Sequence, residues 1–595
     1  MSHLIDQLSA ARQSLAALAG RAGFRPSVVV LDMPAGTGGA AQPDPAAVPA
    51  CTLFFSVTDG QCRARTIHVS ADTFVQAWAQ GEASVRSLCE QEGWGPGATT
   101  WLRVDMVDQV RIMPWQGLQQ ALLRVKRNYF RHGLAFDPGF RWAFTEQELN
   151  ANAMLYGGGS KAHAVVNIAH FRRYGRQRHG PEFKLPLTPD TPVYLLGMTG
   201  VFCGADGVVH KLIGQGPDVG RREVVLQTGE VRALIESAAG HLVRQVLPSG
   251  RFIYGYFPCF DRQIASYNTL RHASTTYAMA EAWGLTRDAA LRDAMERALS
   301  YLTEGLIERR HLPDGRQAAF VVDTGGEIKL GGNAAAILAL VQHAEVTGVN
   351  AHAGLMALLA EGIAFMQDRQ SGGFSHVLHA SDLSIKEQHR IIYYDGEAAF
   401  ALCRLYAFDG DPRWLQVVER AFEHFIAEQH WRAHDHWLAY AVNELTKYRP
   451  EEKYFRFGVQ NVAGHLDFVL KRQTTFPTLL ELMLAAQRML DRLQTMPELS
   501  HLLDDIDQVK FARALTHRAN HLLNGFFWPE MAMFFKWPES ISGSFFIRHQ
   551  SFRVRIDDIE HYLSGYVAYH HWLSHRGVGQ VMLAASHDCA TAELA

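Results

Sequence analysis

The chain has 595 residues, of which 48% are apolar and 20% are charged, with a formal net charge of -3 and a pI of about 6.9. This length and composition predict a globular protein of more than one domain, and the near-neutral charge gives no indication of nucleic acid as a partner. The seven cysteines form no CxxC pair, which excludes a disulfide framework or a zinc finger. There is no basic leader and no apolar run of about eighteen residues, so we expect a cytoplasmic chain without a membrane span.

Residues 1–226 have the mixed pattern of an α+β region, whose fold the sequence does not identify. Turn residues at Asp59-Gly60 and Asp206-Gly207 lie between short apolar runs, which predicts two strand pairs. The expected elements, in chain order, are a helix over residues 1–20, a strand at Val28–Met33, a loop at Pro34–Ala50, the strands Cys51–Val57 and Ala64–Val69, helices near Ala71–Gln80 and Leu118–Phe130, and the strands Val193–Phe202 and Val208–Leu212.

From about Gln227 the pattern changes to consecutive amphipathic helices. A shift of 123 residues aligns the segment from Arg271 with the segment from Tyr394 without gaps, and it places Trp283 on Tyr406. A third, weaker copy begins at Gly332. A repeated helical hairpin cannot bury its apolar face alone, so stacked copies are expected.

Counting hairpins predicts a ring of six over residues 227–575, followed by a tail at 576–595. The helix Gly229–Gln245 would pack outside the last inner helix and close the ring, because closure removes the exposed ends of a stack. Inner helices are expected to begin near Asn268, Gly332, Asp395, Asp435, Phe476 and Asp557, and outer helices near Thr286, Asn350, Asp411, Glu451, Asp507 and Gly229.

This arrangement resembles the (α/α)6 toroids. These include six-hairpin glycosidases, toroid polysaccharide lyases, the N-acylglucosamine 2-epimerase group and the C-terminal domain of D-glucuronyl C5-epimerases. The resemblance covers residues 227–573 and rests on the repeat and on local sequence such as YYDGEAAFALCRLYAFDGDPRWL from Tyr393. It matches no single family: the lyases' paired Asn and His are only loosely echoed at Asn268 and His272. It implies a carbohydrate-active protein whose active cleft lies at one pole of the ring.

Chemically capable side chains gather where the inner helices are expected to begin. If the ring closes, these positions meet at one pole, as glycan chemistry requires, because an acid must protonate an oxygen and a base must accept a proton. The candidate catalytic residues are His272, Asp395, Glu397, His436, Asp558 and His561, and the candidate substrate-binding residues are Tyr267, Asn268, Arg271, Asn333, Tyr394, Asp435, Trp437 and Arg555. Helix capping is the competing explanation for each single carboxylate, but it does not account for the cations beside them.

His272 and Asp395 occupy equivalent positions of the aligned repeats. Equivalent positions should have equivalent geometry, so both are expected to reach the central cleft from the same level. A histidine beside carboxylates should keep its proton near neutral pH and could serve as acid or base.

These features predict an enzyme acting on a glycan, with an acidic polysaccharide or oligosaccharide as substrate and with lyase or epimerase chemistry ahead of hydrolysis. For a uronate, a cation would neutralise the carboxylate at C5, and Tyr or His would remove the C5 proton. The alternative is a non-catalytic glycan-binding or polysaccharide-assembly protein, with residues 1–226 as a docking domain. No cofactor or metal is predicted, and the oligomeric state is left open.

Four further motifs have a structural explanation as well as a functional one. His376, His379, Glu387 and His389 could bind a metal, but loop histidines are usually solvated. Gly157–Lys161 lacks the spacing of a phosphate-binding loop. The basic runs Arg124–Arg131 and Arg172–Lys184 could hold an anion, although a solvated face is the default. The aromatic stretch Phe526–Phe552 could stack on sugar rings or plug the ring.

Overall fold

The computed structural model describes residues 2–19, 25–31, 43–94, 100–185 and 188–575. The predicted loop at Pro34–Ala50 lies partly, and the predicted tail at 576–595 entirely, outside the described residues. The chain divides into two compact units. Unit 1 comprises the chain up to Val224 together with Tyr256–Gln263 and Asn524–Val554, and unit 2 comprises Val225–Gly255, Ile264–Leu523 and the chain from Arg555 onward. None of the described helices is long and apolar enough to cross a membrane.

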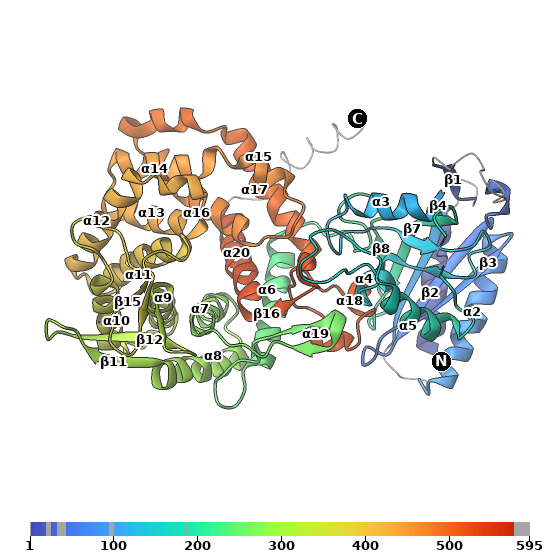
Figure 1. Cartoon of the computed structure of the whole chain (residues 1–595), viewed down its shortest axis with the longest axis horizontal. Coiled ribbons are helices and arrows are strands. Elements are labelled where there is room, and N and C mark those ends of the chain that lie inside the picture. Colours follow the sequence, from blue (N-terminus) through green and yellow to red (C-terminus); the bar gives the residue numbers. More distant parts are fainter. Residues whose placement is uncertain (1, 20–24, 32–42, 95–99, 186–187, 576–595) are drawn as a thin grey trace. The chain divides into compact units, whose positions relative to one another are not determined.

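Unit 1 is built on an eight-stranded sheet (Figure 1). Its strands are β1 (Ser27–Val30), β2 (Cys51–Thr58), β3 (Arg65–Ala71), β4 (Trp101–Pro114), β5 (Gly133–Ala135), β6 (Ala143–Phe144), β7 (Pro192–Cys203) and β8 (Val209–Leu212). The main order is β3-β2-β4-β7-β5-β6, with β1 parallel to β4 and β8 antiparallel to β7. Alternate residues of β2, such as Leu53 and Phe55, pack in one core with helices α1 (Ser2–Ala19) and α2 (Phe74–Gln91), as the two-residue period of a strand requires.

Both predicted strand pairs of this region are present, as β2–β3 and β7–β8. The long strand β4 was not predicted, although it pairs with β2 on one side and β7 on the other. Arg103 and Asp105 interrupt the apolar pattern of β4. They form an ion pair inside the core, at 2.8 Å. Because of this buried ion pair, the central strand does not show the alternation of polar and apolar residues by which a strand is recognised in a sequence.

The aromatic stretch Phe526–Phe552 belongs to unit 1. It contains the short helices α18 (Pro529–Ala532) and α19 (Pro538–Ile541). Glu530 is fully buried and forms an ion pair with Arg222 at 2.7 Å. Rings such as Phe527 and Phe546 stack 4.2 Å apart between centroids. Most of these aromatic faces are therefore core surface, which removes them as platforms for a sugar.

Unit 2 is a closed ring of helical hairpins, as predicted (Figure 1). Its inner helices are α7 (Thr269–Thr286), α9 (Leu330–Thr347), α11 (Tyr393–Asp409), α13 (His436–Tyr448), α16 (Thr478–Leu493) and α20 (Ile556–His575). Each inner helix contacts the next, and α20 contacts α7 again. The chain is thus an α+β region followed by an (α/α)6 toroid, and two segments of the later sequence, Tyr256–Gln263 and Asn524–Val554, belong to unit 1.

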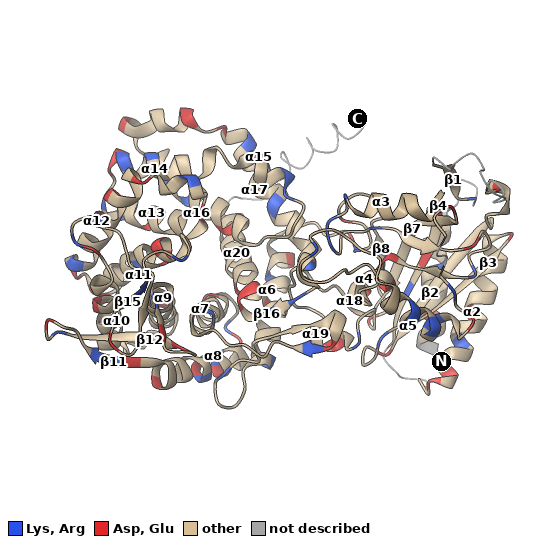
Figure 2. Ribbon diagram, viewed as in Figure 1, with Lys and Arg blue, Asp and Glu red and all other residues tan. Residues whose placement is uncertain are grey.

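The outer helices are α6 (Thr228–Gln245), α8 (Ala289–Tyr301), α10 (Ala353–Phe365), α12 (Pro412–Ala427), α14 (Glu452–Ala463) and α17 (Gln508–Leu522). Helix α6 packs against α20, which confirms that the first helix of the unit closes the ring. The outer helices α12 and α14 carry both acidic and basic residues (Figure 2). That surface is the usual polar outer face of an amphipathic helix.

The 123-residue repeat is also a repeat of backbone geometry. Asp288 and Asp411 accept hydrogen bonds from the first turns of α8 and α12, and each is preceded by a left-handed residue, Arg287 or Gly410. Such paired caps end one helix and begin the next within two residues.

Gly396 lies where α11 and α13 approach most closely, since a Cβ there would stand 2.5 Å from the backbone nitrogen of Leu438. We expect Gly396→Ala to destabilise unit 2 by about 1–3 kcal/mol because backbone cannot move aside. Gly240→Ala is the matched control, because its Cβ would meet nothing within 4 Å in the middle of α6; it should gain about 0.5–1 kcal/mol. Denaturant midpoints of both variants test this, and equal shifts would contradict the close packing.

Candidate functional site

The first turns of five inner helices contribute a continuous group of ionisable side chains, which we call the polar group. Its members are Arg271 on α7, Glu397 on α11, Asp435 and His436 at the start of α13, Glu481 on α16, and Asp557, Asp558, Glu560 and His561 on α20. All of these helices present the same end because the hairpins repeat around the ring. The side chains of His561 and Arg271 are 21% and 35% exposed, so the group reaches the protein surface.

His561 forms the centre of the polar group. Its Nδ1 lies 2.9 Å from Oε2 of Glu481 and 3.4 Å from Oε1 of Glu560. Burial alone would lower the pKa of His561, but the carboxylates of Glu560 and Glu481 raise that pKa to about 10. The imidazole is therefore a cation at neutral pH, and it helps to hold buried carboxylates together across α16 and α20.

Glu397 is almost fully buried on α11. Burial, with a smaller contribution from the charges of Asp435 and Glu560, raises the pKa of Glu397 to about 8. Its carboxyl occupies space that Gly331 leaves free, because a Cβ at Gly331 would lie 1.9 Å from Oε2 of Glu397. A buried carboxyl with such a pKa carries its proton at neutral pH and can act as an acid.

His436 is buried at the start of α13, beside its own helix cap. Asp435 caps the helix through a 2.8 Å hydrogen bond from the backbone N–H of Leu438. Nδ1 of His436 lies 3.2 Å from Oδ1 of Asp435, and its ring meets that of His561 at a centroid distance of 5.2 Å. Nε2 of His436 has no hydrogen-bond partner among the described residues. Asp435 is thus both a cap and a neighbour of a chemically available nitrogen.

Arg271 lies at the exposed side of the polar group. Its Nε is 2.8 Å from Oδ2 of Asp557, and its Nη1–H donates to the hydroxyl of Tyr254 at 2.6 Å. Arg555 binds the same carboxylate of Asp557 and lies 3.5 Å from Asp558. Burial opposes the charge of Arg271, but Asp557 outweighs it and the pKa is raised. Two arginines, Arg271 and Arg555, thus face two carboxylates, Asp557 and Asp558, at this edge.

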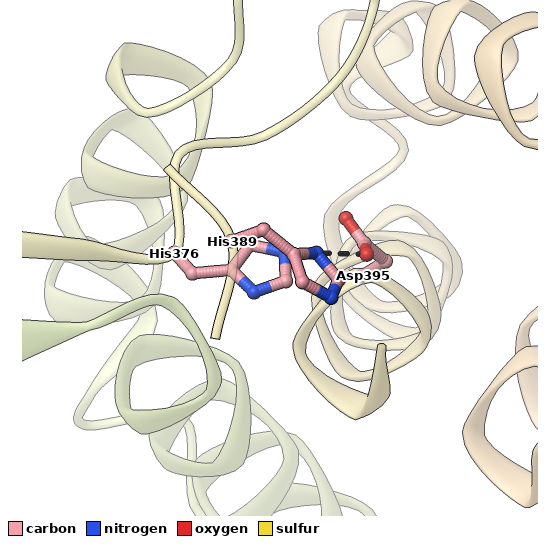
Figure 3. A group of neighbouring side chains, drawn as sticks. All are labelled: His376, His389 and Asp395. Carbon is pink, nitrogen blue, oxygen red and sulfur yellow. Dashed lines mark hydrogen bonds and ion pairs between the residues drawn. The ribbon is translucent and has the colours of Figure 1, made fainter. Parts of the chain in front are cut away.

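Asp395 lies in a second cluster, with His376 and His389 (Figure 3). The backbone N–H groups of Arg390 and Ile391 donate to Nδ1 of His376, at 3.0 and 3.3 Å. The ring proton is therefore on Nε2, which donates to Oδ2 of Asp395 at 3.2 Å. Two loop amides thus determine the tautomer of His376, and that imidazole orients Asp395.

His272 is not part of the polar group, and the expectation of a cleft histidine equivalent to Asp395 is wrong. Its Nε2 lies 2.9 Å from the carbonyl of Ala298 on the outer helix α8, and its Nδ1 lies 2.8 Å from the hydroxyl of Tyr267. Burial lowers the pKa of His272 to about 4, so it is neutral at physiological pH. Nε2 thus joins the inner helix α7 to its outer partner α8, and Nδ1 joins it to Tyr267 just before α7.

Three predicted substrate-binding residues have structural roles. Asn333 is fully buried, and its side chain bonds the backbone of Val321, Ala319 and Leu359. Asn268 caps α7 by accepting from the N–H of Arg271 at 3.1 Å. The hydroxyl of Tyr267 is used by His272 and by the N–H of Phe252. A polar residue at the start of a helix is often needed there by the backbone itself.

The remaining predicted residues lie near the two clusters. Tyr394 packs its ring 5.5 Å from that of His376, and burial, with the charge of Glu397, raises its pKa to about 12. Trp437 is buried against His436, at 5.1 Å between centroids. His379 is exposed on a short strand, and Glu387 pairs with Arg390. These two are therefore separate from the cluster of His376.

Sequence reasoning missed two carboxylates of the polar group, Glu481 and Glu560. Glu481 is the one acidic residue in the otherwise apolar run Leu479–Leu484 of α16. An isolated charge in such a run is a signal for a paired buried group. Glu560 stands directly beside His561, and its other oxygen accepts from Ser274 of α7 at 3.1 Å.

Two sets of side chains could be considered for a cation among the described residues. Their potential ligand atoms lie within 4.8 Å of one another, in His376–His389–Asp395 and in His436–Glu481–His561. In the first set the N–H at Nε2 of His376 donates a hydrogen bond to Asp395. In the second set His561 is itself a cation. A metal would have to displace these protons to bind, and the absence of a metal stays a prediction.

Four buried polar atoms of the polar group have no hydrogen-bond partner among the described residues. They are Oε2 of Glu397, Oδ1 of Asp435, Nε2 of His436 and Oε1 of Glu560. Native proteins leave few such atoms unpaired, and those that remain require an explanation. Oδ1 of Asp435 and Oε1 of Glu560 still lie 3.2 and 3.4 Å from an imidazole nitrogen. The concentration of these four atoms at one place makes this pole the candidate site.

No protein-family model matches the chain, and no curated protein matches it. Solved structures similar to it include cellobiose 2-epimerase from Bacillus thermoamylovorans, with 10% identity, a TM-score of 0.45, and 58% of this chain and 98% of that chain covered. A D-mannose isomerase has 11% identity and a TM-score of 0.43 over 57% and 97%. The GH76A α-1,6-mannanase from Salegentibacter sp. has 12% identity and a TM-score of 0.40 over 58% and 100%.

The buried carboxyl of Glu397 should make the stability of the protein depend on pH. Its pKa is about 8 in the folded chain against an ordinary 4.5. The stability that it contributes is therefore present at low pH and is lost as the pH rises through that window. We expect Glu397→Gln to unfold at higher denaturant than the parent at about pH 8 but not at about pH 5. Glu423→Gln, on the exposed face of α12, controls for loss of a carboxylate; an equal pH dependence in parent and Glu397→Gln would contradict the assignment.

Proposed function

We propose that the chain is a carbohydrate-active enzyme that moves a proton to and from a carbon of an acidic sugar, as an epimerase or lyase, at the polar group of unit 2. The observation that carries the proposal is the set of four buried polar atoms without a hydrogen-bond partner among the described residues, namely one carboxyl oxygen each of Glu397, Asp435 and Glu560 and Nε2 of His436. A sugar presents several hydroxyl groups, each of which can donate and accept, and so can satisfy such a set.

The proton states support acid–base chemistry at this site. His436 would be the base, because its Nε2 is unpaired and can accept a proton. Glu397 would be the acid, since its pKa of about 8 keeps it protonated at neutral pH. In an epimerase, His436 removes the proton at C5 from one face and Glu397 supplies a proton to the other face. In a lyase, the acid instead protonates the departing glycosidic oxygen.

The exposed guanidinium of Arg271 supports an acidic substrate. Arg271 is 35% exposed at the edge of the polar group, and it shares Asp557 with Arg555. A guanidinium in this position can bind the carboxylate of a uronate and stabilise the negative charge that develops when the C5 proton leaves. The cation of His561 lies next to the same acids and would stabilise the same charge.

Hydrolysis is the second candidate, and one observation favours it. Glu397 and Asp435 are two carboxyl groups of the same site, and burial, with a smaller contribution from the charge of Asp435, raises the pKa of Glu397 to about 8. An acid beside a second carboxyl group is the arrangement that glycosidases use. In that case water would add at the sugar and new reducing ends would form, without exchange at C5.

The experiment that separates these functions is incubation of uronate oligosaccharides with the protein in D2O. Deuterium at C5 with no change in chain length supports an epimerase, an unsaturated uronate supports a lyase, and new reducing ends support a hydrolase. Stoichiometric binding of the oligosaccharide with none of the three products would instead support the non-catalytic binding protein and would contradict the proposal.

The catalytic assignment predicts that substitutions of His436 and His272 differ sharply in their effect on kcat. We expect His436→Asn and Glu397→Gln each to lower kcat about a hundredfold or more, because each removes a proton-transfer group. Activity of the parent should fall as the pH rises through the pKa of Glu397 at about 8, since the acid is then ionised. His272→Asn is the control, because that ring contacts α8 and not the polar group; it should lower stability and keep kcat. Full activity of His436→Asn would rule out the assignment.

A further inference from the structure

Unit 1 contains a cavity of about 700 Å³ that the proposed reaction does not use. Its walls come from the segment Cys62–Thr66 leading into β3, from the end of α2, from α5 (Ile168–His179), and from Lys536 and Trp537 before α19. This volume lies within the range of about 300–1,000 Å³ that is typical of small-molecule sites. All of these elements belong to unit 1.

The lining of the cavity is strongly basic. It contains the cations Arg63, Arg65, Arg178 and Lys536 but only one acid, Glu92. Helix α5 itself is rich in basic residues (Figure 2). Three of the cations have acidic partners: Arg65 pairs with Glu92 at 3.3 Å, Arg178 with Glu148 at 3.0 Å, and Lys536 with Asp261.

Arg63 is the exception among these cations. Its guanidinium lies over the ring of Tyr174, at 5.8 Å from the centroid, and no carboxylate of the described residues pairs with it at ion-pair distance. Its Nε is buried without a hydrogen-bond partner in the described part of the chain. Burial lowers the pKa of Arg63, as expected for a cation that lacks a counter-charge. An anion bound in the cavity would supply that charge.

Trp537 gives the same cavity an exposed aromatic face. Its side chain is 47% exposed, whereas most aromatic side chains of Phe526–Phe552 are buried. The indole N–H donates to Oδ1 of Asp261 at 2.9 Å, and Nζ of Lys536 lies 5.1 Å from the ring centroid. The ring is therefore held in place by Asp261 and Lys536, and about half of the side chain remains exposed. Fixed aromatic faces of this kind stack on the apolar faces of sugars.

We propose that this cavity is a separate binding site for an acidic saccharide, with Arg63 pairing with a sugar carboxylate and Trp537 stacking on a sugar ring. A single uncompensated arginine matches the one negative charge that each uronate carries. The helices at the wall contribute their C-terminal turns, since Gln177 and Arg178 end α5 and Glu92 ends α2. Helix C-termini disfavour dense negative charge, which argues against a nucleoside diphosphate.

The test is calorimetric titration of the full-length protein with tetrasaccharides of galacturonate, mannuronate and hyaluronan, with maltotetraose as the neutral probe and a nucleoside diphosphate as the alternative anion. We expect at least one acidic probe to bind. We expect Arg63→Gln and Trp537→Ala each to weaken that binding about tenfold or more. Arg141→Gln is the matched control, since that arginine stacks on Trp142 at 4.4 Å in unit 1 but does not line the cavity.

Binding in the cavity is separable from the reaction proposed for unit 2. Arg271→Gln should leave the binding that depends on Arg63 in place, and Arg63→Gln should leave kcat on short substrates unchanged. If Arg63→Gln fails to fold, the exposed Trp537→Ala variant gives the answer alone. The proposal is overturned if no acidic probe binds, if neither variant weakens binding, or if maltotetraose or the nucleotide binds as tightly with the same dependence on Arg63.

Discussion

The contact between His561 and Glu481 is the interaction on which both the ring and its site depend. It joins the last inner helix, α20, to its neighbour α16 through a 2.9 Å contact between Nδ1 and Oε2. Buried carboxylates are costly unless a cation or a hydrogen bond compensates them. His561 lies within ion-pair distance of two of them, Glu481 on α16 and Glu560 on α20, and so links these two helices at this level.

The same electrostatics explain why Glu397 keeps its proton. The polar group already contains several carboxylates around one imidazole, and adding another negative charge in a buried place is unfavourable. Glu397 therefore ionises only near pH 8. Burial on α11 is the larger cause of this raised pKa, and the neighbouring carboxyl groups of Asp435 and Glu560 add to it.

The ring could be predicted from sequence because each hairpin repeats local signals. Asp288 and Asp411 cap equivalent helices, and apolar residues recur at helical spacing between such caps. The site could be predicted only in part, because sequence gives the end of a helix but not the direction of each side chain around it. His272 and Arg271 are adjacent, yet one faces the outer helix α8 and the other faces Asp557. Position in the repeat therefore located the pole but not the members of the polar group.

Unit 1 shows a different limit of sequence reasoning. Its central strand β4 contains the buried pair Arg103–Asp105, and its core receives a segment from residues 524–554. Neither feature has a local signal, since both depend on partners far away in the chain. The exposed ring of Trp537 and the uncompensated Arg63 become meaningful only when that distant segment is placed beside β3.

The most direct test of the central claim is a crystal structure of the Glu397→Gln variant with an acidic disaccharide bound. If the polar group is the reaction site, a sugar ring should lie at the start of the inner helices, with its C5 facing Nε2 of His436 and its carboxylate on Arg271. A disaccharide bound only in unit 1, with His436 left unpaired in unit 2, would contradict this account.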